Sequence, residues 1–287
     1  MLQTNNNLSI LPFYTSLEKQ NHRKDYAFGE VYPLVTPDKR LLPFQILRET
    51  SASATWNASL KNLYGVTVAD IKDTLLATGF ILTRFESEGY DVIQYPGNLP
   101  LTVDTPEGQY YVQLSDGSRT WYSEVFTVVR HVGDFLKIEF WDEESLDLGA
   151  NKGRVNYTEN FRYRVYLKTQ LGRPAYPIEE QVEKRDGHTF VEKQVSEKTF
   201  KFTFLAPEFL LDAMRLIRLS DHVEVTSKGD TYEPETFLIT PTWKDGGFIA
   251  SVSAEFQTDT VIKKTGRGQA LAEGVVFNDD FNNDFPL

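Results

Sequence analysis

The segment at residues 107–128 constrains the fold of this chain more than any other stretch. It reads EGQYYVQLSDGSRTWYSEVFTV, in which two alternating runs of apolar and polar residues flank a turn at residues 115–118. Alternation with a period of two is typical of half-buried strands, and an Asp-Gly pair between two such runs predicts a β-hairpin. The segment therefore predicts the closing hairpin of a β-sandwich.

The rest of the chain extends this pattern and predicts a mainly β fold with two domains. The length of 287 residues accommodates two cores, and the 13% of aromatic residues suits pleated strands. In residues 41–131, short apolar runs separated by Gly and Pro turns predict an immunoglobulin-like or fibronectin-like β-sandwich. Within it, apolar residues at near-helical spacing over 68–78 predict a short capping helix.

Residues 132–264 predict a second β-sandwich or barrel-like domain that contains one α-helix. The run FRYRVYL at 161–167 alternates in the way expected of a strand with one buried face. Asp-Gly at 186–187, Gly229 and the turn at 245–247 predict three hairpins. The strand between them should place three rings on one face, those of Phe200, Phe202 and Phe204.

The helix of the second domain is predicted by a change of period. After Pro207, which suits an early helical position, apolar residues recur at intervals of three and four over 208–219. A single helix of about three turns is therefore expected there.

Both ends of the chain are expected to lie outside these domains. Residues 1–40 contain three consecutive Asn, three Pro and several aromatics, which fits an extended N-terminal arm, either a disordered leader or a strap on a neighbouring subunit. Residues 265–287 form an acidic, Asn-rich tail that we expect to be flexible. The apolar anchors expected at the protein interface are Leu11, Phe13, Tyr14, Phe277, Phe281 and Phe285.

Composition excludes several functional classes. The chain has no cysteine, so it contains no disulfide, thiolate metal site or catalytic thiol. Its formal net charge of −11 opposes binding to nucleic acid phosphates. No apolar run reaches the roughly 18 residues that a membrane span needs, and the N-terminus lacks the pattern of a signal peptide.

No pattern in the chain predicts catalysis or the binding of a cofactor or metal. The four histidines have no ligand spacing, and no Gly-x-Ser-x-Gly motif is present. The acidic run at 142–144 with Asp147 fits a glycosidase pair, a calcium site or a solvated acidic loop, of which we favour the loop. Large aromatics in strands are core more often than sugar platforms, and this applies to Trp121, Tyr122, Trp141 and Trp243.

The second half also resembles a known class of proteins. Its order is an alternating strand, the EEQVEKRDG hairpin, paired Phe strands, one helix, and closing hairpins that end in AEFQTDTVIKK. This order resembles that of tailed-bacteriophage virion proteins such as tail-tube, distal-tail and baseplate subunits. The hairpin at 107–128 resembles the final strands of immunoglobulin-like modules that decorate them. The resemblance covers residues 40–264 and rests on the order of elements.

The resemblance implies a structural subunit of a ring or tube rather than an enzyme. Such a subunit is made in the host cytoplasm, resides in the virion, and has copies of itself and other virion proteins as partners. A carbohydrate-binding or adhesion module is the alternative, and it predicts a surface platform of aromatics and an export signal. A glycoside hydrolase fragment is a third, which predicts two carboxylates that face each other across a cleft.

Overall fold

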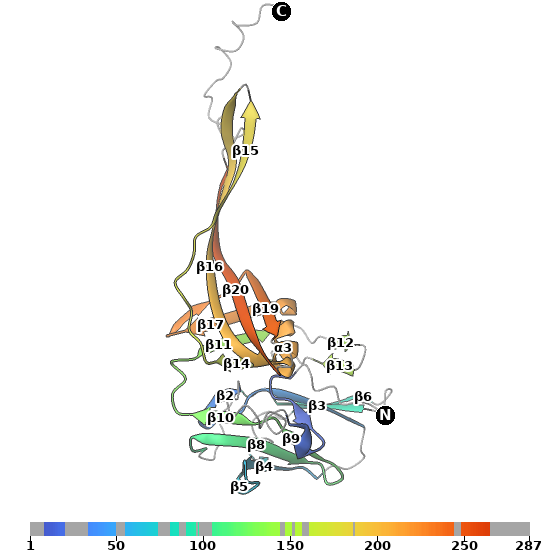
Figure 1. Ribbon diagram of the computed structural model, residues 1–287. Coiled ribbons are helices and arrows are strands. Elements are labelled where there is room, and N and C mark those ends of the chain that lie inside the picture. Colours follow the sequence, from blue (N-terminus) through green and yellow to red (C-terminus); the bar gives the residue numbers. More distant parts are fainter. Residues whose placement is uncertain are drawn as a thin grey trace, which may run out of the picture.

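A computed structural model describes residues 9–20, 34–49, 55–73, 81–85, 90–95, 97, 105–143, 147–150, 153–156, 161–185, 187–243 and 248–264. In this part of the chain the protein is mainly β, as the sequence predicts, with several sheets and one helix of 12 residues. Figure 1 shows a body of packed sheets from which one long hairpin projects.

Two sheets form the first half of the body. The larger sheet contains β1 (Phe13–Tyr14), β2 (Val35–Pro37), β4 (Asn57–Asn62), β5 (Thr67–Asp70), β8 (Gly108–Ser115), β9 (Thr120–Ser123) and β10 (Phe126–Val129). Its order is β1-β9-β8-β10-β2, and β4 joins β5 to the other edge of β8. The smaller sheet consists of β3 (Phe44–Glu49), β7 (Tyr90–Tyr95) and β6 (Ile81–Phe85), in this order.

These two sheets pack into a β-sandwich. The predicted hairpin is formed by β8 and β9, and its alternation buries Val112, Leu114 and Trp121 completely or almost so. The ring of Phe13 on β1 lies 4.7 Å from that of Phe44 on β3, measured between centroids, and so joins the two sheets. Buried aromatic contacts of this kind stabilise a fold by about 0.5–1.5 kcal/mol beyond the area they bury.

The described part of the predicted N-terminal arm belongs to this sandwich. β1 pairs with β9, and β2 runs parallel to β10. The expectation of a separate arm is therefore corrected for residues 9–20 and 34–40, because their apolar side chains fill the core of their own domain. The expected helix at 68–78 is also corrected at its start, since Thr67–Asp70 forms strand β5.

Two further sheets curve into a half-barrel in the second half of the body (Figure 1). The third sheet has the order β14 (Tyr163–Leu167), β11 (Leu136–Trp141), β17 (His222–Ser227), β18 (Asp230–Tyr232). The fourth has the order β15 (Ile178–Arg185), β16 (His188–Pro207), β20 (Ile249–Lys264), β19 (Thr236–Trp243). A separate antiparallel pair consists of β12 (Asp147–Ala150) and β13 (Gly153–Asn156).

The hairpins predicted for this half are confirmed. β15 pairs with β16, β17 with β18, and β19 with β20, all antiparallel. Lys228 and Gly229 both have positive φ, at 53° and 93°, as a tight two-residue turn between paired strands requires. Phe200, Phe202 and Phe204 are all buried, as their alternation predicts.

Strand β14 is buried on both faces, which corrects the expectation of one buried face. Arg164 and Tyr166, expected to face solvent, are only 9% and 6% exposed. Nη1 of Arg164 donates to the carbonyl oxygen of Gly97 at 3.3 Å, and Gly97 follows strand β7 of the sandwich. The sandwich therefore covers the outer face of this strand, and one hydrophobic core runs through both halves.

The predicted helix is present over its full length. Helix α3 (Glu208–Met214) begins after Pro207 and continues into the 3-10 helix η3 (Arg215–Leu219). Its inward side buries Phe209, Leu210, Ala213, Met214, Leu216 and Ile217. A shorter 3-10 helix, η1 (Leu17–Lys19), lies in the N-terminal segment.

Candidate functional site: a projecting arm and a helix groove

The hairpin of β15 and the first part of β16 leaves the body and forms a projecting arm (Figure 1). We define the arm as β15 together with residues 188–196 of β16. Its strands pair from Ile178 opposite Ser196 to Arg185 opposite His188, so only two residues form the turn. Gly187 in this turn has φ +78°, which explains the Asp-Gly sequence at this point.

The base of the arm is held by a bulge and a backbone bridge. The register of β16 against β20 shifts between Ser196 and Lys198, and Asp259 on β20 has φ +50°. Bulges of this kind increase the local twist of a sheet. Ala175 and Thr199 exchange two backbone hydrogen bonds, of 2.8 and 2.9 Å, which fix the chain where it enters the arm. The arm therefore starts from an ordered base.

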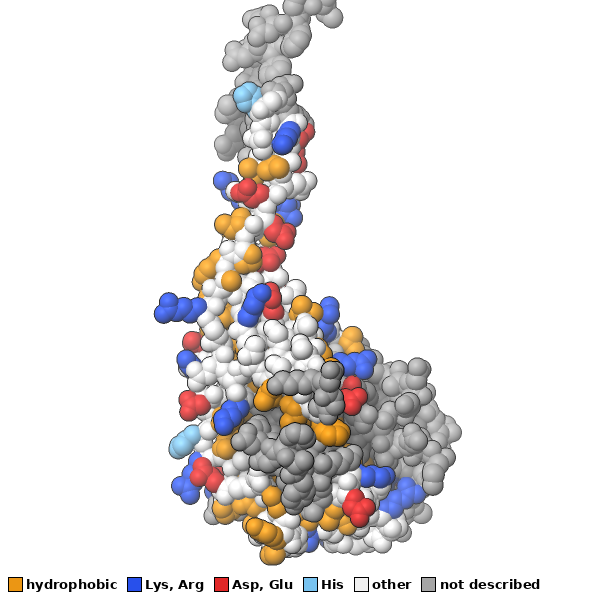
Figure 2. Space-filling view, in the orientation of Figure 1, with side chains coloured by type: hydrophobic (Ala, Val, Ile, Leu, Met, Phe, Trp, Pro, Cys, Tyr) orange, Lys and Arg blue, Asp and Glu red, His pale blue; other side chains and the backbone are white. Residues whose placement is uncertain are grey.

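The surface of the arm combines charged and apolar side chains, as Figure 2 shows. Ile178 and Val182 on β15 are 64% and 47% exposed, and Tyr176 just before the arm is 64% exposed. At the end of β20, which pairs with the lower part of the arm, Val261 and Ile262 are also exposed. Because β15 is the edge strand of its sheet, its outer backbone groups have no strand partner in the described part of the chain.

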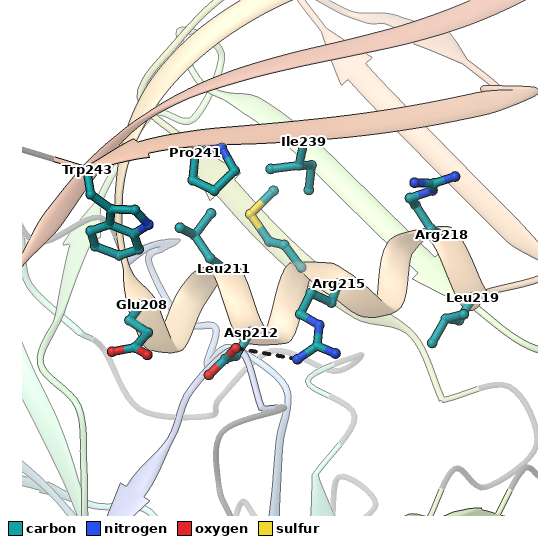
Figure 3. Close-up of a pocket in the computed structure, with 10 residues that line it drawn as sticks. Glu208, Leu211, Asp212, Arg215, Arg218, Leu219, Ile239, Pro241 and Trp243 are labelled. Atoms are coloured by element: carbon teal, nitrogen blue, oxygen red, sulfur yellow. Dashed lines mark ion pairs between the residues drawn. The ribbon is translucent and has the colours of Figure 1, made fainter. Parts of the chain in front are cut away.

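A second surface feature is a groove between the helix and the edge strand β19. The main hollow of this groove has a volume of about 670 Å³. Figure 3 shows Leu211 on the helix pointing toward Pro241 on β19, with Trp243 and Ile239 on either side of Pro241. The other lining residues are Glu208, Asp212, Met214, Arg215, Arg218 and Leu219. We call this feature the helix groove.

The charges of the helix groove are separated along its length. Glu208 and Asp212 lie toward one end, and Arg215 and Arg218 toward the other (Figure 3). Burial, followed by the nearby Glu208 carboxylate, raises the pKa of Asp212 above its ordinary value. Nη1 of Arg215 lies 3.8 Å from Oδ1 of Asp212, while Arg218 forms no ion pair with any described residue.

Of the six predicted interface residues, two are corrected by the structure. Leu11 is fully buried and Phe13 is 1% exposed, so both are core residues of the sandwich and are not available to a neighbouring subunit. Tyr14 is half-buried, and its hydroxyl donates to Glu124 at 3.3 Å. The other three, Phe277, Phe281 and Phe285, lie outside the described residues.

The aromatics weighed as a sugar platform do not share one surface. Trp121 is 1% exposed and belongs to the core. The ring of Trp141 stacks on His222 at 5.1 Å between centroids, and the guanidinium of Arg162 lies 3.8 Å from the Trp141 centroid. Among the tryptophans, Trp243 is the one with a large exposed fraction, 44%, and it lies in the helix groove.

Of the acidic run at 142–144, Asp142 is buried, which corrects the expectation of a solvated loop at this residue, whereas Glu144 lies outside the described residues. Asp142 is 4% exposed and accepts a hydrogen bond from the backbone N–H of Asp221 at 3.0 Å. Burial raises the pKa of its carboxyl above the ordinary value. Glu143, which is exposed, lies 2.9 Å from Nε2 of His222. These groups fix the end of β11 to the start of β17.

The described residues lack two further kinds of feature. No group of three or more His, Asp or Glu side chains in this part of the chain is arranged to hold a metal ion. Within the same residues, no helix has the length and apolar character needed to cross a membrane.

No protein-family model matches the chain, and no curated protein matches it either.

Proposed function

We propose that this protein is a structural subunit of a tailed-bacteriophage virion, which assembles with copies of itself into a ring or tube of the tail, baseplate or connector. The observation that carries the proposal is the projecting arm, with its exposed Ile178 and Val182. The order of elements in the second half, which resembles that of virion proteins, gives the proposal its biological setting. The protein would be made in the host cytoplasm and reside in the virion.

The first argument concerns the stability of the arm. A two-stranded hairpin is marginally stable in water unless its strands pack on something else. Within the part of the chain that the structure describes, the outer part of the arm, from Val182 to Val191, has a strand partner on one side only. Contact with a neighbouring molecule would bury its apolar side chains and stabilise it.

The second argument concerns the kind of contact. An exposed edge strand is a template for pairing with another chain, and β15 offers such an edge far from the body. A contact between this edge and a different surface of the next copy is heterologous, and heterologous contacts generate rings or filaments. Head-to-tail contacts of this kind would be repeated from copy to copy, as a ring or tube requires.

Shortening the arm tests this function. Glu180 and Gln194 pair across the hairpin, so residues 181–193 can be replaced by Asn-Gly while the lower strand pairs remain. For the full chain we expect particles of several copies by light scattering and negative-stain microscopy, and for the shortened variant a folded monomer. A full chain that remains monomeric at high concentration would refute the proposal.

A carbohydrate-binding or adhesion module is the second candidate. One observation favours it: Trp243 is exposed and lines the helix groove together with Glu208 and Asp212. An aromatic ring next to carboxylates suits the stacking and hydrogen bonding of a sugar. Glycan-array binding by a monomeric protein, abolished in Trp243→Ala, would favour this candidate.

A further inference from the structure

The turn that joins β4 to β5 presents apolar side chains to solvent at the end of the body opposite the arm (Figure 1). Tyr64 is 92% exposed, Val66 59% and Val68 40%, and no described large apolar side chain is more exposed than Tyr64. Figure 2 shows hydrophobic side chains gathered at this end of the molecule. We call residues 61–68 the tip.

The tip is held in place by hydrogen bonds around Asn62. Its side-chain Oδ1 accepts from the backbone N–H groups of Tyr64 and Val66, both at 3.0 Å. Its carbonyl oxygen accepts from the N–H of Gly65 at 2.9 Å, and Nζ of Lys61 donates to the carbonyl oxygen of Gly65 at 3.3 Å. An exposed aromatic side chain on a preorganised turn loses little conformational entropy on binding, which is the property of an interface anchor.

We infer that the tip of one copy inserts Tyr64 into the helix groove of a neighbouring copy. The inference rests on the proposed function in that it needs a second copy of the chain, and it names a contact that does not involve the arm. This contact cannot form within one molecule, because β4 is fixed against β8 in the sandwich, whereas the helix lies in the other half of the body (Figure 1).

The helix groove has the size and lining that an aromatic anchor needs. Leu211 forms one wall of its main hollow, and Ile239, Pro241 and Trp243 form the other (Figure 3). Pockets of more than about 300 Å³ hold whole small-molecule ligands, so a hollow of about 670 Å³ has room for a tyrosine ring. The exposed ring of Trp243 provides an aromatic partner for it.

The charges of the tip and the groove are complementary. The groove continues into a second hollow of about 320 Å³, and the charged residues that line the two hollows are Glu208, Asp212, Asp221, Glu235, Arg215 and Arg218. Four carboxylates thus face two guanidinium groups. The tip carries a single charge, the ammonium of Lys61, which lies beside the carbonyl oxygen of Gly65. The tip therefore brings a cation and the hydroxyl donor of Tyr64 to a groove with an excess of carboxylate acceptors.

The backbones of both surfaces favour recognition through side chains over the addition of a strand. The register of β4 against β5 shifts between Leu60 and Lys61, and irregularities of this kind blunt an edge strand. On the groove, Pro241 of β19 has no backbone N–H and interrupts the row of donors that an added strand would need. The contact is therefore expected to depend on the Tyr64 side chain.

The contact is small, which defines its role. A large aromatic side chain buries about 150–250 Å², whereas a stable interface buries about 800 Å² on each partner. The tip is therefore too small to hold two copies together at low concentration. It would instead orient copies that a larger contact, such as that of the arm, brings together. This agrees with a monomeric arm-shortened variant under dilute conditions.

Cross-linking between two introduced cysteines tests the contact directly, because the chain has no cysteine of its own. Val66→Cys puts a thiol on the tip and keeps Tyr64, and Arg215→Cys puts one in the groove and removes no group that the contact uses. The two full chains, one with an affinity tag, are mixed and treated with a short bismaleimide. A mixed dimer is expected on a denaturing gel. Adding Tyr64→Ser to the Val66→Cys chain should lower its yield at least about tenfold.

Three controls separate insertion from accidental collision. Arg130→Cys, on the exposed surface of the sandwich, replaces Arg215→Cys and should give at least about tenfold less mixed dimer. Tyr64→Ser should leave the thermal midpoint nearly unchanged because Tyr64 is 92% exposed, so its lower yield would not reflect misfolding. Lys61→Glu on the tip should lower the yield, and Glu208→Lys in the groove of the partner chain should restore it.

The outcome is separable from that of the proposed function. If the full chain assembles but Arg215→Cys reacts no better than Arg130→Cys, the insertion is wrong and the proposed function stands. If the full chain stays monomeric, the proposed function fails, and the arm-shortened chain at millimolar concentration decides: a cross-link that requires Tyr64 supports the insertion, and its absence overturns it. A yield indifferent to Tyr64→Ser, with a strong cross-link from Glu180→Cys on the arm to Arg215→Cys, would overturn it too, because the arm would then occupy the groove.

Discussion

Arg48 on β3 and Asp116 at the end of β8 are 68 residues apart in sequence, and Nη1 of the arginine lies 2.9 Å from Oδ2 of the aspartate. The same guanidinium donates to Asp91 on β7, and all three side chains are at most 3% exposed. Oδ1 of Asp116 accepts from the backbone N–H groups of Ser118 and Arg119. One aspartate thus closes the hairpin turn and ties it to the opposite sheet of the sandwich.

Replacing Arg48 by methionine should destabilise the sandwich strongly. The change would remove the buried guanidinium that contacts both Asp91 and Asp116, and breaking a buried pair in this way costs about 3–5 kcal/mol. Urea unfolding monitored by circular dichroism measures the loss. Arg130→Met is the matched control, because the Arg130 side chain is 70% exposed and lies 4.0 Å from Glu107. Equal losses in the two variants would contradict this account.

Gly97 at the junction of the two halves should not tolerate a side chain. It has φ +65°, and a Cβ placed there would lie 2.7 Å from the carbonyl oxygen of Leu41. Gly97→Ala should therefore lower the free energy of unfolding by about 1–3 kcal/mol. In the control, Gly133→Ala, the new Cβ meets no atom within 4 Å. Thermal unfolding of both variants tests the difference, and a neutral Gly97→Ala would show that the junction relaxes.

The elements of the fold were predictable where local chemistry determines them. The turn at 115–118, the Asp-Gly turn before His188 and the helix after Pro207 each carry a local signal of turn residues or period, and each is present. The burial of Arg164 was not predictable, because it depends on a carbonyl of the other half, at Gly97. Alternation in one strand cannot show that a second layer covers its polar face.

The candidate site was predictable only in part. The sequence around β15 has charged residues at successive positions, which is a signal that neither face of the strand enters a core, yet it does not show that the hairpin projects. The helix groove depends on how the helix lies against β19, which no periodicity encodes. Phe13 lies in a segment whose sequence predicts no regular structure, so it was expected to be available at an interface. Its burial depends on strand β1, which has only two residues and is too short to be predicted from alternation.

The stability of the protein should fall in acid partly through Glu139. Burial opposes ionisation of this carboxyl, but the Lys137 ammonium and the Arg164 guanidinium outweigh it and lower its pKa below the ordinary 4.5. Just below that pH the unfolded chain binds more protons than the folded one, so stability is lost as pH falls toward the folded pKa. Glu139→Gln should make the urea midpoint less dependent on pH between about 5 and 2, although it lowers stability at neutral pH.

Asp142 is the control for Glu139, because its pKa is shifted in the opposite direction. Its pKa is raised by burial, so above the ordinary value of 3.8 the folded chain binds more protons, and stability declines as pH rises through this window. Asp142→Asn keeps an oxygen for the backbone N–H of Asp221 and removes this decline. The urea midpoint of Asp142→Asn, measured relative to that of the parent chain, should therefore rise as the pH increases from acid toward neutral. If the pH dependence of the urea midpoint changed in the same direction in Glu139→Gln and Asp142→Asn, the assignment of opposite pKa shifts to the two carboxyls would be wrong.

Mutation of Phe13 tests whether this residue belongs to the core of the sandwich or to an interface between subunits. Because it is 1% exposed and packs on Phe44, Phe13→Ala should cost about 3–5 kcal/mol of unfolding free energy. Tyr14→Phe removes only the hydroxyl that donates to Glu124 and should cost far less. Equilibrium denaturation of the arm-shortened monomer measures both. An interface anchor would behave differently, since its loss would change the particle mass and leave the monomer as stable as before.

The apolar side chains of the arm should govern assembly without contributing to the monomer fold. Ile178 and Val182 are 64% and 47% exposed, so the double change to serine removes little buried area within the chain and should leave the thermal midpoint nearly unchanged. If a neighbour covers these side chains, the same change shifts sedimentation velocity profiles from large particles to monomer. The matched control is Glu180→Ser with Lys184→Ser, two exposed polar positions on the same strand. Assembly that weakens equally in both pairs would mean that the arm acts through its backbone edge, and assembly that persists in both would remove the arm from the interface.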